Sequence, residues 1–277
     1  MNIRFALLIS LIITILGCKK EERDFRESNF FVYYSRQCNY AWAFNARGET
    51  ITIGNQSANK YTSLKENSSV KISEYILGFT TCNISLSDIS QSLSPDYMNN
   101  YLSEEIDPIT YSPYMVLARS SRPMTDQADP IIENRLRTYL ENYNTQNMSR
   151  ADFAVNIDYI DYRITPLKYI KITCSTEIAG IKPGNPLNDL FLVKGYPINH
   201  YFIITSNKNI ITDPSKISNI SINQYLSYTP MAPAELRLQM KKNVSIAKPI
   251  IAQFTIELQT EDRTTIKTET KPIQFIP

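Results

Sequence analysis

Two acidic side chains, Glu105 and Asp107, have the spacing that carboxylate chemistry on a strand would need. Residues two apart on a strand point to the same face, and retaining glycoside hydrolases hold two carboxyl groups about 5 Å apart. Pro108 follows at once, however, and proline disfavours a central strand. The next residues, 109–111, supply no further acid. We therefore expect this segment to be a solvated loop or the end of a helix, and not a catalytic site.

The other groups that could do chemistry are one histidine and a few aspartates. His200 is the only histidine, so a histidine-rich metal centre is excluded and any imidazole base would have to be this residue. It lies at the entry to an apolar segment, where a partly buried histidine is ordinary. Asp152, Asp158 and Asp161 offer oxygen ligands for calcium, but their spacing matches no EF-hand loop. We expect no catalytic residues, no metal and no cofactor, and hence no enzyme.

Aromatic side chains are the strongest lead to a binding function. The chain has 18 tyrosines and one tryptophan. Amphipathic aromatics serve as interface hot spots and as stacking platforms for sugar rings, although packing into the core or its rim is the interpretation we favour for most of them. The candidates for ligand binding are Trp42, Tyr33, Tyr34, Tyr111 and Tyr114.

The cysteines permit at most one disulfide when the N-terminal cysteine, discussed below, is set aside. Cys38, Cys82 and Cys174 remain, and sequence alone does not fix a pairing. Cys38 and Cys82 share the N-terminal third of the chain, so we favour that bridge; the alternative is that all three thiols stay reduced and buried.

The N-terminus has the features of a processed export signal. Arg4 precedes the apolar run Phe5–Leu16, and Gly17 and Cys18 are followed by the charged cluster Lys19–Arg23. A membrane-spanning helix needs roughly 20 apolar residues, so this shorter run is typical of a cleaved signal peptide. Its end, Ile-Leu-Gly-Cys, resembles the lipobox of bacterial lipoproteins, in which the cysteine is lipidated with acyl chains such as palmitate and becomes the new N-terminus.

Residues 1–17 are thus the expected signal peptide, and residues 18–28 a flexible, charged tether. Several buried acyl chains, at about 0.8 kcal/mol per methylene, would hold the protein durably on a membrane. The sequence Lys-Lys-Glu-Glu at 19–22 resembles the export signal that places lipoproteins of Bacteroidota on the outer face of the outer membrane. We expect outer-membrane, surface-exposed anchoring at Cys18, with the periplasmic face as the alternative.

Residues 29–277 have the pattern of a mainly β domain. Short segments rich in β-branched and aromatic residues, separated by polar turns, predict an immunoglobulin-like antiparallel β-sandwich. In the tail, Phe254, Ile256 and Leu258 alternate on one face, and segments 264–270 and 273–275 are expected to return against them. Gly78 is expected to mark a bulge or bend in its strand.

A proline-punctuated section at about 93–150 is the expected helical insertion in this domain. Segment 130–143 has Asp129 as a candidate N-cap and Pro130 at the first helical position. Residues 132, 136, 139, 140 and 143 would share its apolar face. A second, shorter helix is expected at 96–105.

The lipobox, the tyrosine-rich middle and the terminal hairpin together resemble the uncharacterised outer-membrane lipoproteins of Bacteroidota. That resemblance implies a lipid-anchored surface protein and supplies no catalytic residues. With 29 basic and 27 acidic residues there is no electrostatic footprint for nucleic acid. We expect a binding or interaction module for a glycan or protein ligand; the alternatives are a carboxylate-dependent glycan hydrolase and a structural component of the envelope.

Overall fold

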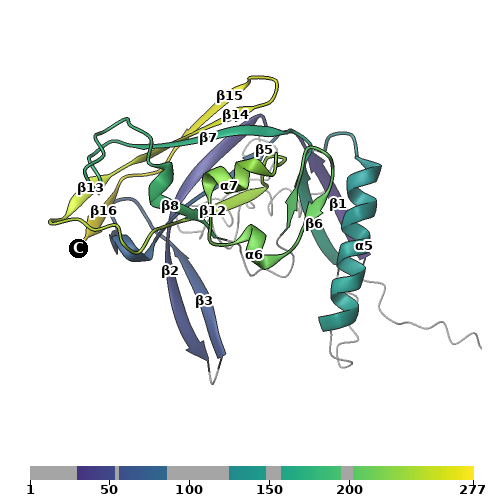
Figure 1. Cartoon of the computed structure of the whole chain (residues 1–277), viewed down its shortest axis with the longest axis horizontal. Helices are drawn as coiled ribbons and strands as arrows, with labels where there is room; N and C mark the ends of the chain where they lie inside the picture. Colours follow the sequence, from purple (N-terminus) through teal and green to yellow (C-terminus); the bar gives the residue numbers. More distant parts are fainter. Residues whose placement is uncertain (1–29, 54–55, 86–124, 148–156, 195–201) are drawn as a thin grey trace, which may run out of the picture.

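The computed structural model describes residues 30–53, 56–85, 125–147, 157–194 and 202–277 (Figure 1). These residues form several antiparallel sheets with few, mostly short helices, so the expected mainly β fold is confirmed. The predicted signal peptide and tether lie outside the described residues, as does the helix expected at 96–105. Among the residues that are described, no helix is both long and apolar enough to cross a membrane.

The largest sheet has six strands in the order β11-β8-β12-β5-β2-β3, and every neighbouring pair is antiparallel. Strand β5 is buried along its whole length, as expected for a central strand with both faces covered. The strands are β11 (Ile220–Ser221), β8 (Phe191–Val193), β12 (Glu235–Met240), β5 (Tyr75–Cys82), β2 (Tyr40–Ile53) and β3 (Gln56–Ser63).

A second layer of two three-stranded sheets, β15-β14-β7 and β13-β16-β4, shares a hydrophobic core with one face of the large sheet. Phe254, Ile256 and Leu258 of β14 are completely buried in it, each contributing about 1.5–3 kcal/mol. Tyr75 of the large sheet stacks on Phe254 with ring centroids 5.2 Å apart. The strands are β15 (Thr265–Glu269), β14 (Phe254–Thr260), β7 (Leu167–Cys174), β13 (Ile250–Ala252), β16 (Ile273–Ile276) and β4 (Ser69–Lys71).

The C-terminal strands follow the sequence pattern in part. β14 and β15 form the predicted antiparallel hairpin. The prediction that residues 273–275 return against this hairpin was wrong. They lie in β16, which pairs with β13 in antiparallel and with β4 in parallel orientation. Pro272, just before β16, lacks the N–H that would continue the β15 ladder.

A smaller unit packs around a second hydrophobic core. It combines the parallel pair β1 (Phe30–Arg36) and β6 (Ile157–Arg163), the helix α5 (Pro130–Asn147), and the hairpin of β9 (Ile203–Ile204) and β10 (Ile210–Ile211). Figure 1 shows α5 running alongside β1 and β6. Parallel pairing requires a long crossover connection, and the chain from β1 to β6 passes through β2 to β5 and α5. This arrangement departs from the expected all-antiparallel layout.

The helix α5 begins as predicted. Asp129 Oδ1 accepts hydrogen bonds from the N–H groups of Ile131 and Ile132, at 3.1 and 3.2 Å, which satisfies two of the four orphan donors of the first turn. The buried face includes Ile132, Leu136 and Leu140. The described ranges also contain the short helices α6 (Pro214–Ile217) and α7 (Ile222–Ser227) and the 3₁₀ turns η1 (Ile72–Glu74) and η2 (Asn188–Leu190).

Gly78 lies in a regular part of β5, so the predicted bulge was wrong. It pairs with Phe44 on one side and Arg237 on the other with no break in register. The ring of Phe44 lies across it, and a Cβ at this position would come within 2.1 Å of Phe44 Cζ. Glycine is therefore needed here because a side chain covers the backbone.

Gly78→Ala should lower the free energy of unfolding by about 1–3 kcal/mol, the usual cost of overpacking. Gly48→Ala is the matched control, since its nearest neighbour is the flexible end of Ile76. Chemical denaturation of both variants measures the difference. An equal loss in both would contradict the packing of Phe44 over Gly78.

Candidate functional site

The aromatic residues predicted to bind a ligand do not form one platform. Tyr33 and Tyr34 are neighbours on β1 and point to opposite faces of it. Tyr33 packs against the smaller core, and Tyr34 is buried. Trp42 lies on β2 in the large sheet. Tyr111 and Tyr114 lie outside the described residues.

The acidic residues weighed for chemistry are also separated. Glu105, Asp107, Asp152 and His200 lie outside the described part of the chain. Asp161, near the end of β6, forms ion pairs with two arginines. These positively charged neighbours are unlike the oxygen ligands that surround a calcium ion. Within the described ranges there is no group of three or more His, Cys, Asp or Glu residues that could hold a metal ion.

Arg36 and Arg163 form the buried centre of a polar network around Asp161. They pair in register across β1 and β6, and their side chains are completely inaccessible to solvent. Asp161 Oδ1 accepts hydrogen bonds from Arg36 Nε at 3.2 Å and from Arg163 Nη1 at 2.6 Å. This carboxylate therefore offsets the repulsion between two guanidinium groups that would be costly to bury alone.

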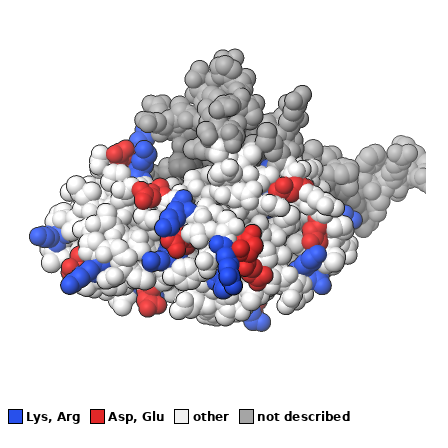
Figure 2. All heavy atoms as spheres, turned by 90° about the horizontal axis from the view of Figure 1, so that it is seen from above, with Lys and Arg blue, Asp and Glu red and all other residues white. Residues whose placement is uncertain are grey.

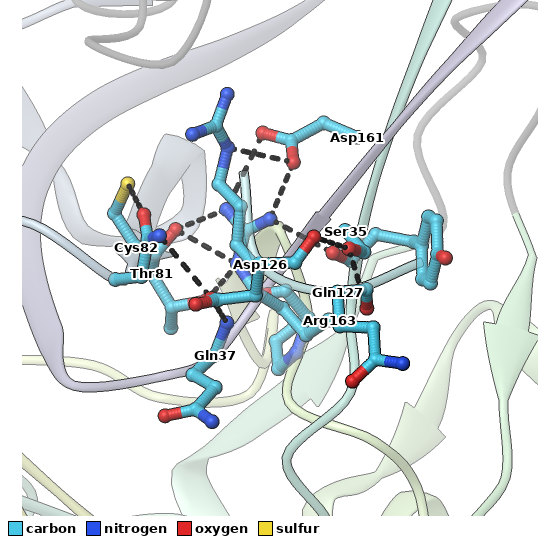
Figure 3. A network of polar contacts seen from close by, with 12 residues as sticks. Ser35, Gln37, Thr81, Cys82, Asp126, Gln127, Asp161 and Arg163 are labelled. Atoms are coloured by element: carbon cyan, nitrogen blue, oxygen red, sulfur yellow. Dashed lines mark hydrogen bonds and ion pairs between the residues drawn. The ribbon is translucent and has the colours of Figure 1, made fainter. Parts of the chain in front are cut away.

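Arg163 also joins β6 to β5 of the large sheet (Figure 3). Its Nε donates to both the carbonyl oxygen and Oγ1 of Thr81, each at 3.0 Å, and its Nη2 donates to the same carbonyl. Thr81 Oγ1 in turn donates to the carbonyl of Pro233 at 2.6 Å. Burial lowers the pKa of Arg163, but the charge and hydrogen bond of Asp161, together with the nearby thiols of Cys82 and Cys38, raise it, so that the net shift is upward and the group stays charged.

Asp126 extends this network at the ends of β1 and β5. Its carboxylate accepts hydrogen bonds from the N–H of Gln37 at 2.6 Å and from Asn83 Nδ2 at 3.2 Å. Its carbonyl accepts from Ser35 Oγ at 2.8 Å, and its N–H donates to the carbonyl of Ser35. These contacts hold the segment before α5 against both units (Figure 3).

Cys38 and Cys82 lie beside Arg163, and both are free, buried thiols. The N–H of Asn39 donates to the carbonyl of Cys82 at 3.0 Å, which brings the two chain segments together. Burial raises the pKa of Cys38 to about 11, although the charge of Arg163 opposes the shift. Thiols of this kind are unreactive at neutral pH. A disulfide between them stays a prediction, and Cys174 is likewise a free, buried thiol.

A cavity of about 150 Å³ lies where the smaller unit meets the large sheet. It is much smaller than the roughly 300–1,000 Å³ of drug-sized pockets, so it admits one small group. Asp161 and Arg163 line it from β6, and Glu235 lines it from the start of β12. The opposite wall is apolar and includes Phe202 and Met231. The cavity thus has a charged wall and an apolar wall.

Glu235 belongs to a row of polar side chains that crosses three strands of the large sheet. It pairs with Thr80 of β5, and Thr80 pairs with Trp42 of β2. Directly paired residues share a face of the sheet. We call Trp42, Thr80 and Glu235 the polar row.

Two buried hydrogen-bonding atoms of the polar row have no partner within the described part of the chain. Thr80 is completely buried. In the described residues neither its Oγ1 nor Trp42 Nε1 has a hydrogen-bond partner. A buried polar group left unsatisfied costs about 1–3 kcal/mol.

Glu235 is the ionisable member of the polar row. Arg237 Nε donates to its Oε1 at 2.5 Å, a contact that uses one of the two carboxylate oxygens. Burial raises the pKa of Glu235, and the charge of Arg237 only partly opposes this shift. The Arg237 guanidinium itself lies over the ring of Tyr61, 4.9 Å from its centroid.

Sequence reasoning missed Glu235, Thr80 and the arginine pair. Residues 234–240 alternate between apolar and polar types, and in a half-exposed sheet such alternation would put Glu235 and Arg237 on the solvent side. In the structure Arg237 is 2% exposed. The available signal of a buried ion pair was that Glu235 and Arg237 carry opposite charges and lie two residues apart in one strand.

The chain matches no protein-family model and no curated protein. Two solved structures show a weak likeness, both of the major pilin subunit BcpA of Bacillus cereus. One has 11% identity and a TM-score of 0.21, covering 88% of this chain and 68% of that one. The other, of a variant of that pilin, has 9% identity and a TM-score of 0.18, covering 89% and 68%.

The adjacent residues Thr80 and Thr81 provide a test of the hydrogen bonds described above. Thr80→Val removes a hydroxyl that has no partner among the described residues, so the free energy of unfolding should stay unchanged or rise by up to about 1 kcal/mol. Thr81→Val removes two hydrogen bonds, one of them with a charged group, and should lower it by about 2–3 kcal/mol.

Urea unfolding of the purified variants without added ligand measures both effects. The same loss in both variants, or a larger loss in Thr80→Val, would mean that the Thr80 hydroxyl has a structural partner.

Proposed function

We propose that this protein is a lipid-anchored outer-membrane protein that displays an immunoglobulin-like β domain at the cell surface and binds a ligand there. The observation that carries the proposal is the lipobox ending at Cys18, preceded by a short apolar run and followed by charged residues. Lipidation of one cysteine would tether everything after it. Whatever the domain binds is then bound at a membrane surface.

The electrostatics of the described surface agree with a glycan or protein ligand. Figure 2 shows basic and acidic side chains interspersed over the face in view, without a field of one sign. Binding of nucleic acid depends on clustered lysine and arginine. We therefore propose a ligand that is neutral or carries charges of both signs, and not a nucleic acid.

Binding is favoured over hydrolysis by the contacts of the two carboxylates that line the cavity. Asp161 accepts from two arginines, and Glu235 from one. Carboxylates engaged in this way offset the charge of buried arginines, which is a structural role. The second candidate, a carboxylate-dependent glycan hydrolase, is favoured by one observation: Asp161 and Glu235 share a cavity, and the pKa of Glu235 is raised, as in a general acid.

Metabolic labelling with an alkyne-tagged palmitate should mark the wild-type protein and not Cys18→Ala, because only that thiol is placed for lipidation. Cys38→Ala is the matched control and should label like wild type. Protease treatment of intact cells should degrade the wild-type protein.

Equal labelling of wild type and Cys18→Ala would contradict the anchor. Complete protection from protease in intact cells, with normal labelling, would place the protein on the periplasmic face instead.

A further inference from the structure

The cavity between the two units offers a ligand one carboxylate oxygen that is not already used. Glu235 lines the cavity, and its side chain is 15% exposed. Arg237 Nε donates to Oε1 of this carboxylate, and no described residue donates to Oε2. Burial raises the pKa of Glu235, so a further hydrogen-bond donor would stabilise its charged form.

The other charged groups of the wall are occupied by one another. Asp161 accepts from Arg36 and Arg163 at Oδ1, and from Arg163 Nη2 at Oδ2, the last at 3.4 Å. Every nitrogen of the Arg163 guanidinium donates to Asp161 or to Thr81. An anionic ligand would therefore find no free donor on the one arginine that lines the cavity.

The charge around the cavity disfavours a cationic ligand as well. The two carboxylates of the wall pair with three guanidinium groups, so three positive charges face two negative ones and leave an excess of one positive charge. An added ammonium group would be repelled by this excess. The group that fits is thus neutral and brings a donor for Glu235.

The opposite wall requires that this group also has an apolar part. Phe202, Ile203 and Met231 line it. Phe202 and Ala234 are half-buried, so the cavity is reached from their side. Its volume of about 150 Å³ admits only a group of a few heavy atoms. Burying a polar group against such a wall without a hydrogen bond would be costly.

We propose that the cavity is a subsite for the acetamido group of an N-acetylated sugar. The amide N–H of that group would donate to Glu235, its methyl would pack against Met231 and Phe202, and the sugar ring would remain at the mouth, beside Ala234. A sugar hydroxyl brings a donor without a methyl, and an unacetylated amino sugar brings a positive charge. The subsite rests on the binding function proposed above and specifies its ligand.

Met231 provides the reporter for this proposal. It lines the cavity, and the sequence has only seven methionines, so the methyl NMR signals of methionine are few enough to resolve. The full-length protein, labelled with [methyl-¹³C]methionine and purified in a detergent without a sugar headgroup, is titrated with N-acetylglucosamine and N-acetylgalactosamine. Met231→Leu identifies the signal. At least one of the two sugars should shift it in a saturable way.

Matched sugars test the acetamido group. Glucose and glucosamine, each without the acetyl group, should bind at least about tenfold more weakly, the effect of losing one hydrogen bond of about 1.4 kcal/mol. Nε-acetyl-lysine presents the same acetamido group on a protein side chain and tests whether the sugar ring contributes to affinity.

Two substitutions test the cavity. Glu235→Gln should weaken the N-acetylated sugar by about tenfold, because the acceptor loses its charge. Ala234→Leu keeps the carboxylate and fills the mouth, so it should abolish the shift of Met231. Glu257→Gln is the matched control and should bind like wild type, since its carboxylate pairs with Lys267 on β14 and β15. Circular dichroism confirms that each variant is folded.

The outcomes separate the subsite from the function on which it rests. Equal affinity for glucose or glucosamine overturns the acetamido assignment and leaves glycan binding standing. Tighter binding of Nε-acetyl-lysine replaces the sugar with a protein ligand. Unchanged binding in Ala234→Leu, or shifts of other methionines without Met231, overturns the cavity as the site while binding itself stands. No shift of any methionine overturns the subsite, and the labelling of Cys18 tests the anchor independently.

Discussion

The guanidinium of Arg163 is the interaction on which the rest of the described structure depends, because it joins two separately packed units. Its donors reach Asp161 on its own strand and Thr81 on the central strand of the large sheet. Burying this charge is costly unless it is paired and fully hydrogen-bonded, and here both conditions are met. The cavity lies at this junction, so its charged wall is fixed by the same contacts.

The polar row contrasts with that network. All three nitrogens of the Arg163 guanidinium have partners, whereas the completely buried hydroxyl of Thr80, the residue next to Thr81, has none among the described residues. A buried hydroxyl without a partner costs about 1–3 kcal/mol, so the row lowers stability beside a network that joins the two units.

Much of the fold could be predicted from local patterns. Asp129 and Pro130 marked the start of α5, and the alternation of Phe254, Ile256 and Leu258 marked β14, because caps and strand periodicity act within a few residues. The parallel pairing of β1 with β6 could not be predicted, since it joins segments more than a hundred residues apart through register alone. Gly78 was misassigned for the same reason: the ring that requires it belongs to Phe44, on another strand.

The candidate site was less predictable than the fold. Aromatic residues were recognised by type, but nothing local shows that Trp42, Thr80 and Glu235 pair across three strands. The burial of Arg36, Arg163 and Arg237 ran against the usual position of arginine at surfaces. Sites assembled across strands depend on register, which a single sequence specifies only weakly.

Native-state hydrogen exchange of wild type and Arg163→Met tests most directly whether this guanidinium joins the two units. If it does, the N–H of Ile164, which donates to the carbonyl of Arg36, and the amides of β1 and β6 should exchange on the order of a hundredfold faster in the variant, through local opening. The amides of β7 and β14 should keep their wild-type rates. Equal acceleration in all four strands, or none in β1 and β6, would contradict that role for Arg163.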